Sequence, residues 1–394
     1  MLSRVFMYNY PLVPYNIIIL QILVLSRRIF MKVTVLGEPQ IIMSNEGSHH
    51  AYFGWPTAAR LQNGKIAVVA SGYRRRHICP FGKTVISYSE DEGKTYTRPA
   101  PVIDTVLDDR DGGITTFGET GVVVTSFNNV VAFQRSLPYA DAYDHSYLDT
   151  VTPEKEARDI GSTFCFSFDC GVTFGPVYKS PVSAPHGPVE LPDGSLLLVG
   201  MDYNPHPIDG PRNVDYIRAY KMNLDGSLEY VGKIENVKIG DVEPICCEPH
   251  TVVLDDGSLI THIRVQHFDE NLKVVLFTLF QSESYDLGKT WTTPHQVLPV
   301  LGGAPPHLFK HSSGMLICTY GYREAPFGVK TMFSTDNGKT WDYGHDIYVN
   351  GICGDLGYPS TVELNDGSLI TVFYAHPKEN APAVIMQQKW SFTE

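Results

Sequence analysis

Short apolar segments separated by tight turns recur along the chain. Near the C-terminus one such segment ends at Asp366-Gly367, and a second one, residues 368–374, follows it. Asp-Gly suits a tight hairpin turn, because glycine accepts positive φ. Related phrases occur six times, with turn glycines at Gly64, Gly121, Gly194, Gly257, Gly314 and Gly367. The pattern predicts six antiparallel hairpins of one kind.

The spacing of the hairpins indicates a larger repeated unit. Successive turn glycines lie roughly 53 to 73 residues apart, and each interval has room for about four strands, which is typical of propellers or repeat arrays. The 394 residues include 43% hydrophobic residues, 34 glycines and 27 prolines. This composition provides a sizeable core and many turns. We therefore expect an all-β protein.

A second repeated element supports the same unit. Four copies of Ser-x-Asp-x-Gly-x-Thr-aromatic lie at residues 89–96, 167–174, 284–291 and 334–341. Serine and aspartate side chains can bond backbone groups inside a turn, glycine supplies the unusual φ, and the aromatic ring can pack into the sheet. We assign these residues to folding rather than to catalysis.

These four copies resemble the Asp-box, or bacterial neuraminidase (BNR) repeat, of the sialidase superfamily. The resemblance covers residues 31–394 and implies a six-bladed β-propeller. Radial repetition leaves few exposed sheet edges, and we expect the ring to close by pairing residues 32–36 with residues 384–390.

Residues 1–30 are expected to form a separate N-terminal extension. Their apolar run, residues 16–26, ends at Arg27-Arg28 and is too short to span a bilayer comfortably. It fits a secretion signal or anchor, or a sequence upstream of a start at Met31. Seven cysteines without a CxxC pair favour a reducing compartment, so we expect a cytoplasmic rather than a secreted protein.

Charge and motifs exclude several classes of partner. The net charge of −12 argues against a nucleic-acid partner, which needs a basic surface. A membrane partner is not expected. The histidines lack an HxH or HExxH arrangement, and there is no Gly-rich nucleotide loop, so we expect neither a metal nor a cofactor.

In the predicted ring, polar residues adjoining the hairpins would converge on one rim. Buried polar groups cost free energy unless they are paired, so such a ring favours a polar ligand. The candidates are Trp55, Asp108, Arg110, Asp111, His186, Glu248, His250, His307, Asp355 and Tyr358 before the first strands, and Arg74, Arg264 and Arg323 after the second strands.

Two segments are similar to catalytic segments of sialidases. Residues 247–254, which include Glu248, are followed by Arg264, and this arrangement resembles the segment with the family's catalytic glutamate and one arginine of its carboxylate-binding triad. Residues 357–360 resemble the segment with its tyrosine nucleophile, here Tyr358. The resemblance implies these three roles, and it makes Arg323 a plausible second triad arginine.

The chemistry explains why these residue types belong together. A free phenol titrates near ~10, so a carboxylate such as Glu248 must accept its proton during attack. A neutral phenol is not repelled by an anomeric carbon that bears a carboxylate. An arginine fork can hold that carboxylate through two parallel hydrogen bonds.

Two parts of the sialidase pattern are missing from their usual places. Trp55 stands before Pro56 where the first triad arginine is expected, and residues 71–83 contain no aspartate to act as acid/base. Arg74 could replace the arginine from the facing strand end. The proton could come from His77, Asp108, Asp109 or Asp111.

Three functions remain open on the sequence. The first is a glycoside hydrolase that releases a terminal acidic sugar, sialic acid or a related ulosonic or uronic acid, from an acidic glycan. The second is a propeller polysaccharide lyase, with His186, His250 or His307 and Tyr358 as base and acid. The third is a noncatalytic glycan-binding propeller. The sequence does not indicate an oligomeric state.

Overall fold

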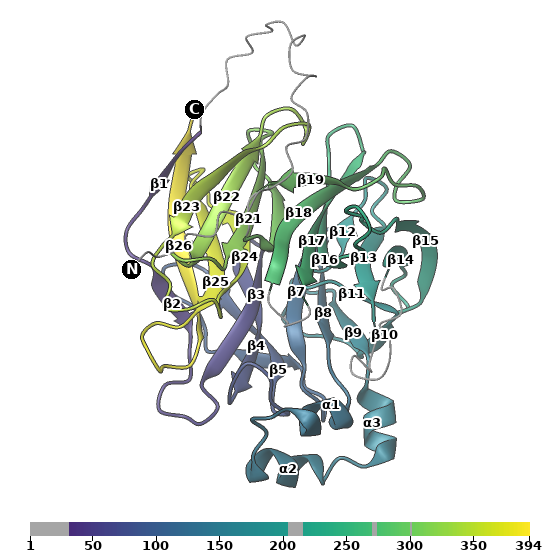
Figure 1. Cartoon of the computed structure of the whole chain (residues 1–394), viewed down its shortest axis with the longest axis vertical. Coiled ribbons are helices and arrows are strands. Elements are labelled where there is room, and N and C mark those ends of the chain that lie inside the picture. Colours follow the sequence, from purple (N-terminus) through teal and green to yellow (C-terminus); the bar gives the residue numbers. More distant parts are fainter. Residues whose placement is uncertain (1–30, 204–215, 270–273, 300–301) are drawn as a thin grey trace, which may run out of the picture.

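The computed structural model describes residues 31–203, 216–269, 274–299 and 302–394. The expectations for residues 1–30 therefore lie outside the described residues. The chain forms six antiparallel sheets of four or five strands arranged around one axis (Figure 1). This arrangement confirms the predicted six-bladed β-propeller.

Each sheet is one blade. In the first five blades the strands run outward from the axis in chain order, and in the sixth the outer strands β1 and β2 come from the start of the described chain. The first blade contains β3 (Tyr52–Arg60), β4 (Ile66–Arg74), β5 (Lys83–Ser89) and β6 (Ala100–Ile103). The second contains β7 (Arg110–Phe117), β8 (Gly121–Phe127), β9 (Ser162–Ser167) and β10 (Tyr178–Ser180). The third contains β11 (Val182–Ser183), β12 (Val189–Glu190), β13 (Leu196–Asp202), β14 (Ile217–Met222) and β15 (Leu228–Ile234). The fourth blade contains β16 (Ile245–Val253), β17 (Leu259–Phe268), β18 (Val274–Ser284) and β19 (His295–Leu298). The fifth contains β20 (Ala304–Lys310), β21 (Leu316–Tyr322), β22 (Gly328–Ser334) and β23 (Asp342–Tyr348). The sixth contains β24 (Gly357–Glu363), β25 (Leu369–Ala375) and β26 (Val384–Thr393) with β1 (Lys32–Val35) and β2 (Gln40–Met43).

The sixth blade closes the ring. Strand β26 pairs with β1, so that Val35 lies opposite Trp390, and it also pairs with β2. The outer strands of this blade thus come from the start of the described chain and its inner strands from the end, as the sequence predicted. Closure leaves the first and last blades without a free face between them.

The core is divided among the contacts between neighbouring blades. Six clusters of buried apolar side chains fill these contacts, and each draws on two consecutive blades. Strand β4 shows why its sequence reads as a continuous apolar run. It packs against a neighbour on both faces, so its residues from Ile66 to Ala70 are all fully buried.

The four Ser-x-Asp-x-Gly-x-Thr copies form the same turn after the third strand of their blades. In the last copy, Ser334 accepts a hydrogen bond from the backbone N–H of Gly338 (2.8 Å), and Asp336 accepts bonds from the backbone and side chain of Thr340 (2.9 and 2.6 Å). The Gly338 carbonyl accepts a bond from Gln281 of the preceding blade (2.9 Å). These turns therefore connect adjacent blades as well as ending strands.

Two features differ from the sequence prediction. In the second hairpin the positive-φ glycine is Gly118 (φ 53°), whereas Gly121 lies inside β8. The second blade also contains three short helices that the sequence did not predict: α1 (Val131–Ser136), α2 (Ala142–Leu148) and α3 (Pro153–Asp159). Among the described residues, no helix is long and apolar enough to cross a membrane.

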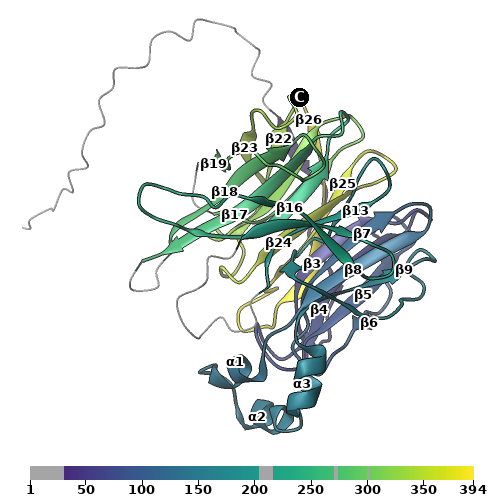
Figure 2. The same ribbon diagram turned by 90° about the vertical axis from the view of Figure 1, so that its right-hand side faces the viewer.

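The helical insert lies between β8 and β9, below the propeller in the views of Figures 1 and 2. Asp141 and Asp144 form a capping box at the start of α2. Both carboxylates also accept hydrogen bonds from Arg75, at 2.6 to 2.8 Å. Because Arg75 follows β4 directly, these ion pairs hold the insert against the first blade.

We expect Ser334→Ala to lower the free energy of unfolding by about 1–3 kcal/mol, because it leaves the buried backbone N–H of Gly338 without its acceptor. The measurement is urea unfolding of the purified protein. Thr335→Ala is the matched control, since Thr335 is exposed in the same turn and should change stability by less than about 0.5 kcal/mol. Equal stability of the two variants would contradict a folding role for this turn.

Candidate functional site

Four inner strands are interrupted by bulges at equivalent positions near one end of the axis. The strand registers shift between Gly54 and Thr57, Arg110 and Gly113, Cys247 and His250, and Gly357 and Ser360. Within each bulge one non-glycine residue has positive φ: Trp55 (55°), Asp111 (46°), Glu248 (50°) and Tyr358 (49°). Bulges re-aim side chains, and bulky residues adopt positive φ only where the surrounding structure enforces it. The four side chains mark the candidate site.

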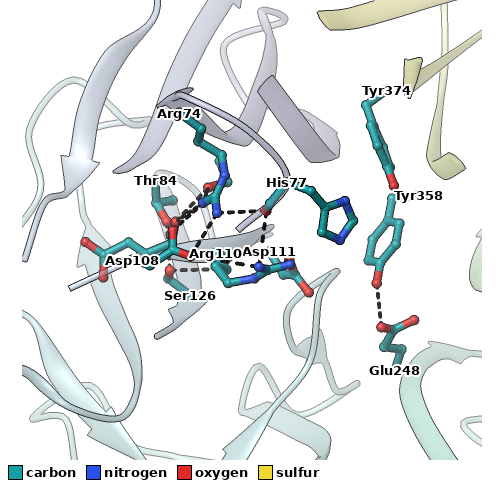
Figure 3. Close-up of polar contacts among 12 residues, drawn as sticks. Arg74, His77, Thr84, Asp108, Arg110, Asp111, Ser126, Glu248, Tyr358 and Tyr374 are labelled. Carbon is teal, nitrogen blue, oxygen red and sulfur yellow. Dashed lines mark hydrogen bonds and ion pairs between the residues drawn. The ribbon is translucent and has the colours of Figure 1, made fainter. Parts of the chain in front are cut away.

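Tyr358 and Glu248 are in direct contact across this site (Figure 3). The Tyr358 hydroxyl donates a hydrogen bond to Glu248 Oε1 at 2.5 Å. Arg264 Nη1 donates to Glu248 Oε2 at 2.6 Å and to Tyr358 Oη at 3.5 Å. The structure thus brings together the three residues that the sequence motifs nominated.

The environment of Tyr358 keeps its phenol neutral. Its side chain is almost fully buried, and this burial raises the pKa of Tyr358 well above its usual value. The carboxylates of Glu248 and Asp111 raise the pKa further, while Arg264 and Arg323 oppose them. Deprotonation of Tyr358 therefore requires a base in contact with it, and Glu248 occupies that position.

Two arginines flank the phenol and are held by residues that the sequence analysis missed. Arg264 donates to Gln266 through Nε (3.1 Å) and Nη2 (2.7 Å). Arg323 donates to the Leu356 carbonyl (3.0 Å) and to Tyr374 Oη (3.2 Å), with its guanidinium carbon 5.7 Å from the centre of the Tyr358 ring. The spacing of two between Arg264 and Gln266 places both side chains on one face of β17 and could have identified Gln266.

Asp111 is a buried acidic residue of the site with a strongly perturbed pKa. It is 6% exposed, and its Oδ1 atom has no hydrogen-bond partner among the described residues. Burial raises its pKa to about 7; Arg110 opposes this shift, and the charge of Glu248 adds to it. Figure 3 shows Asp111 beside Arg110. Such a carboxyl group can hold a proton near neutral pH.

Trp55, Arg74 and Asp108 were expected to face a substrate, but the structure encloses them. Arg74 and Asp108 are fully buried and joined by hydrogen bonds, including Nη2 to Oδ2 at 2.8 Å. Two guanidinium groups contact Trp55, with Arg74 at 4.8 Å and Arg110 at 4.3 Å from its ring centre. The N–H groups of Arg74 already donate hydrogen bonds to surrounding oxygen atoms, so none is left for a ligand carboxylate. Arg74 therefore does not take the place of the missing triad arginine.

A second carboxylate, Asp355, organises the neighbouring part of the rim. It accepts hydrogen bonds from Tyr52 (2.9 Å) and Tyr374 (3.0 Å) and lies within 3.0 Å of ring nitrogens of His77 and His376. Burial opposes ionisation of Asp355, but the bonds from His376 and His77 outweigh it and lower its pKa far below the usual value. The imidazole of His77 remains 45% exposed beside Trp55 and is the accessible member of this group.

His186, His250 and His307 do not join Tyr358 and Glu248. His250 and His307 are stacked with ring centres 4.6 Å apart, and His186 meets both edge-on at 5.2 and 5.0 Å. His250 lies two residues beyond Glu248 along β16, so this cluster forms a deeper layer across the axis. All three are buried, and this burial lowers their pKa values, to about 3 for His250. This depth differs from the expected rim position.

Among the described residues, no group of three or more histidine, cysteine, aspartate or glutamate side chains is arranged to hold a metal ion. None of the seven cysteines, all of which lie in the described part of the chain, is in a disulfide.

Comparison with known proteins relates the chain to others through its fold. No protein-family model and no curated protein sequence matches it. Among solved structures, a protein of unknown function from Dyadobacter fermentans superposes with a TM-score of 0.70 and 18% identity, covering 92% of this chain and 99% of that one.

Two glycosidases also superpose over most of the chain. The NanB sialidase of Streptococcus pneumoniae gives a TM-score of 0.63 at 11% identity, covering 91% of this chain and 71% of that one. The α-L-arabinofuranosidase Arb93A of Fusarium graminearum gives 0.59 at 11% identity, covering 90% and 97%. At these identities the likeness shows a shared six-bladed propeller fold.

The buried histidines predict acid-sensitive stability. Their folded pKa values lie below the unfolded value of about 6.5, so the unfolded chain binds more protons below that pH. The free energy of unfolding should therefore fall as pH drops from about 6.5, with a contribution of about 1.4 kcal/mol per pH unit from each histidine. Urea unfolding between pH 4.5 and 8 measures this slope.

His250→Gln is the informative variant for that slope, because a glutamine carbonyl can still accept the Leu308 N–H bond that His250 Nδ1 accepts at 2.8 Å. We expect the variant to remain folded and to lose about 1.4 kcal/mol per pH unit of the acid dependence. The exposed His49→Gln serves as control. An unchanged slope in His250→Gln would show that His250 is not held neutral in the folded protein.

Proposed function

We propose that this protein is a retaining glycoside hydrolase that releases a terminal acidic sugar, sialic acid or a related ulosonic or uronic acid, from a glycan. The observation that carries the proposal is the 2.5 Å hydrogen bond from the Tyr358 hydroxyl to Glu248, with Arg264 in contact with both. A buried tyrosine paired with a half-buried carboxylate, both at strained strand bulges, is an unusual and costly arrangement for a purely structural role.

In the first step, the Tyr358 oxygen attacks the anomeric carbon while its proton moves to Glu248 Oε1. The bond between the anomeric carbon and the glycosidic oxygen breaks, and a sugar–tyrosine ether-like bond forms. Water later attacks the same carbon and gives a proton to the Asp111 carboxylate, which lost its own proton to the leaving oxygen in the first step. The bond between the carbon and the tyrosine oxygen breaks, and the tyrosine recovers its proton from Glu248. Two displacements at one carbon retain its configuration.

The leaving oxygen needs a proton, and Asp111 is the best-placed donor on electrostatic grounds. Its pKa of about 7 keeps a large fraction of the carboxyl group protonated near neutral pH. Its charge also acts on Tyr358, which places the two groups in one electrostatic environment. In this assignment, Asp108 serves to fix Arg74 behind Trp55 and does not touch the substrate.

The proposed acidic substrate follows from the positive charge around the neutral phenol. Arg264 and Arg323 flank Tyr358, and Arg110 lies across from them beside Asp111. Guanidinium groups are the best protein partners for a carboxylate, and a neutral nucleophile does not repel one. The fold alone does not choose the sugar, because both a sialidase and an arabinofuranosidase share it.

His77 supports a second candidate, a uronate lyase. Partial burial lowers the pKa of His77, while Asp355 at 2.9 Å opposes this shift and orients the ring. A neutral, oriented imidazole is a suitable base for removing the proton next to a uronate carboxylate, with Tyr358 returning a proton to the leaving oxygen. In this reading His77 replaces the deeper histidines as the base.

Tyr358→Phe and Glu248→Gln should each lower kcat at least about 10³-fold, since each removes one partner of the nucleophilic step. The assay is release of a fluorogenic aglycone from a sialoside and from uronides, with product analysis by mass and ultraviolet absorbance. Tyr348→Phe, a half-buried tyrosine outside the site, is the control. Full activity in both site variants would reject the proposal, and an unsaturated product would establish the lyase instead.

Asp111→Asn tests the acid separately. If the protonated Asp111 is required, kcat of the parent falls as pH rises above about 7, and this alkaline limb disappears in the variant. The rate should drop more for an unactivated glycoside than for an aryl glycoside, whose leaving group needs less protonation. An alkaline limb that persists in Asp111→Asn, and disappears in His77→Gln, would assign the proton to His77.

A further inference from the structure

A cavity lies on the propeller axis, on the far side of the histidine layer from Tyr358. All six inner strands contribute to its wall, and its volume is about 530 Å³. This falls within the range of small-molecule sites, about 300–1,000 Å³. We call it the axial funnel. His186, His250 and His307 line its inner end, and Thr116 and Lys310 belong to its wall.

The tautomers of two of these histidines follow from their backbone partners. His250 Nδ1 accepts a hydrogen bond from the Leu308 N–H (2.8 Å), and His307 Nδ1 accepts one from the Thr361 N–H (3.3 Å). Each Nδ1 therefore carries no proton, and each neutral ring carries its proton on Nε2. The stacked pair offers two N–H donors side by side.

His186 has the opposite tautomer. The Thr57 hydroxyl donates its one proton to the Pro185 carbonyl (3.0 Å), so the 3.0 Å contact between Thr57 Oγ1 and His186 Nδ1 needs a proton on Nδ1. His186 Nε2 is then a free acceptor. It is buried and has no hydrogen-bond partner among the described residues. An unpaired buried acceptor costs free energy, which a donor from a bound molecule would recover.

Charge and tautomer narrow the chemistry of that molecule. A metal ion would need lone pairs on Nε2 of His250 and His307, but these two nitrogen atoms carry protons and cannot coordinate it. An anion would be repelled by the Nε2 lone pair of His186. The cations near the mouth are already paired, Arg60 with Glu92 and Lys310 with Asp255. A hydroxyl group fits all three histidines, because it both accepts and donates hydrogen bonds.

We propose that the axial funnel binds a neutral polyhydroxylated molecule, a sugar or polyol, through His186, His250 and His307. This site is independent of the reaction proposed at Tyr358. The histidine layer separates the two ends of the axis, so a ligand in the funnel does not occupy the site at Tyr358.

The experiment uses the full chain with the Tyr358→Phe substitution, which prevents turnover at the other end. The protein is labelled with ¹⁵N-histidine and titrated with methyl β-D-glucopyranoside, with glycerol, and with glucuronic acid as the anionic counterpart. We expect saturable shifts of the His250 and His307 ring resonances with the neutral glycoside, and at least tenfold weaker binding of the uronic acid. His250→Gln assigns its resonance and should weaken binding.

Thr116→Trp is the blocking variant, because Thr116 is a half-buried wall residue and a tryptophan there fills the funnel. It should abolish the shifts, while Glu248→Gln, at the other end, should leave them unchanged. Circular dichroism establishes that each variant is folded, and Thr116→Val, which keeps the funnel open, should bind like the parent. Absence of saturable shifts would mean that the funnel holds only water and would overturn the proposal. Shifts that persist in Thr116→Trp, or tighter binding of glucuronic acid than of the neutral glycoside, would also overturn it.

Discussion

The structure depends on how six inner strands share one narrow axis. Regular strands would project alternate side chains toward the axis at every level, and Gly113 shows how little space remains there. A Cβ atom at this glycine would lie 2.4 Å from Thr125 Oγ1 and 2.5 Å from the Gly187 nitrogen. Bulges in the inner strands relieve this crowding and turn selected side chains toward one end. The positive φ of Trp55 and Tyr358 is the local cost, of the order of 1–3 kcal/mol each.

This geometry explains the electrostatic character of the candidate site. Bulges in different blades bring Glu248, Asp111 and Tyr358 into one largely buried space, so the charges of the two carboxylates act on Tyr358 and the charge of Glu248 acts on Asp111. Two carboxyl groups near one another favour a shared proton, and burial adds to this tendency. Arg264 forms an ion pair with Glu248 at 2.6 Å, while burial raises the pKa of Asp111 to about 7.

The sequence predicted most of the fold because its signals are local and repeated. Asp-Gly turns and the four Ser-x-Asp-x-Gly-x-Thr copies each act within about ten residues, and together they determine the blades. The helices of the insert were missed since each has only six or seven residues, too few for a helical period to emerge. The turn glycine of the second hairpin was assigned to Gly121 instead of Gly118, because both glycines lie close to this turn.

The candidate site was predictable only in part. Tyr358, Glu248 and Arg264 stand in recognisable local phrases. The depth of each residue along the axis could not be predicted in the same way, because a bulge changes the register between neighbouring residues such as Glu248 and His250. Burial of Arg74 likewise depends on Asp108, from the segment between β6 and β7, and no local pattern in the sequence links the two.

Ring closure has a consequence for how the chain reaches this structure. Strand β1 pairs with β26 across more than three hundred residues of sequence, and such a contact carries a large loop-closure entropy. The sixth blade cannot form until β26 has been synthesised, so β1 and β2 have no partner strand before that point. Tyr358 belongs to that last blade. The candidate site is therefore completed in the final stage of folding, and incompletely folded chains lack it.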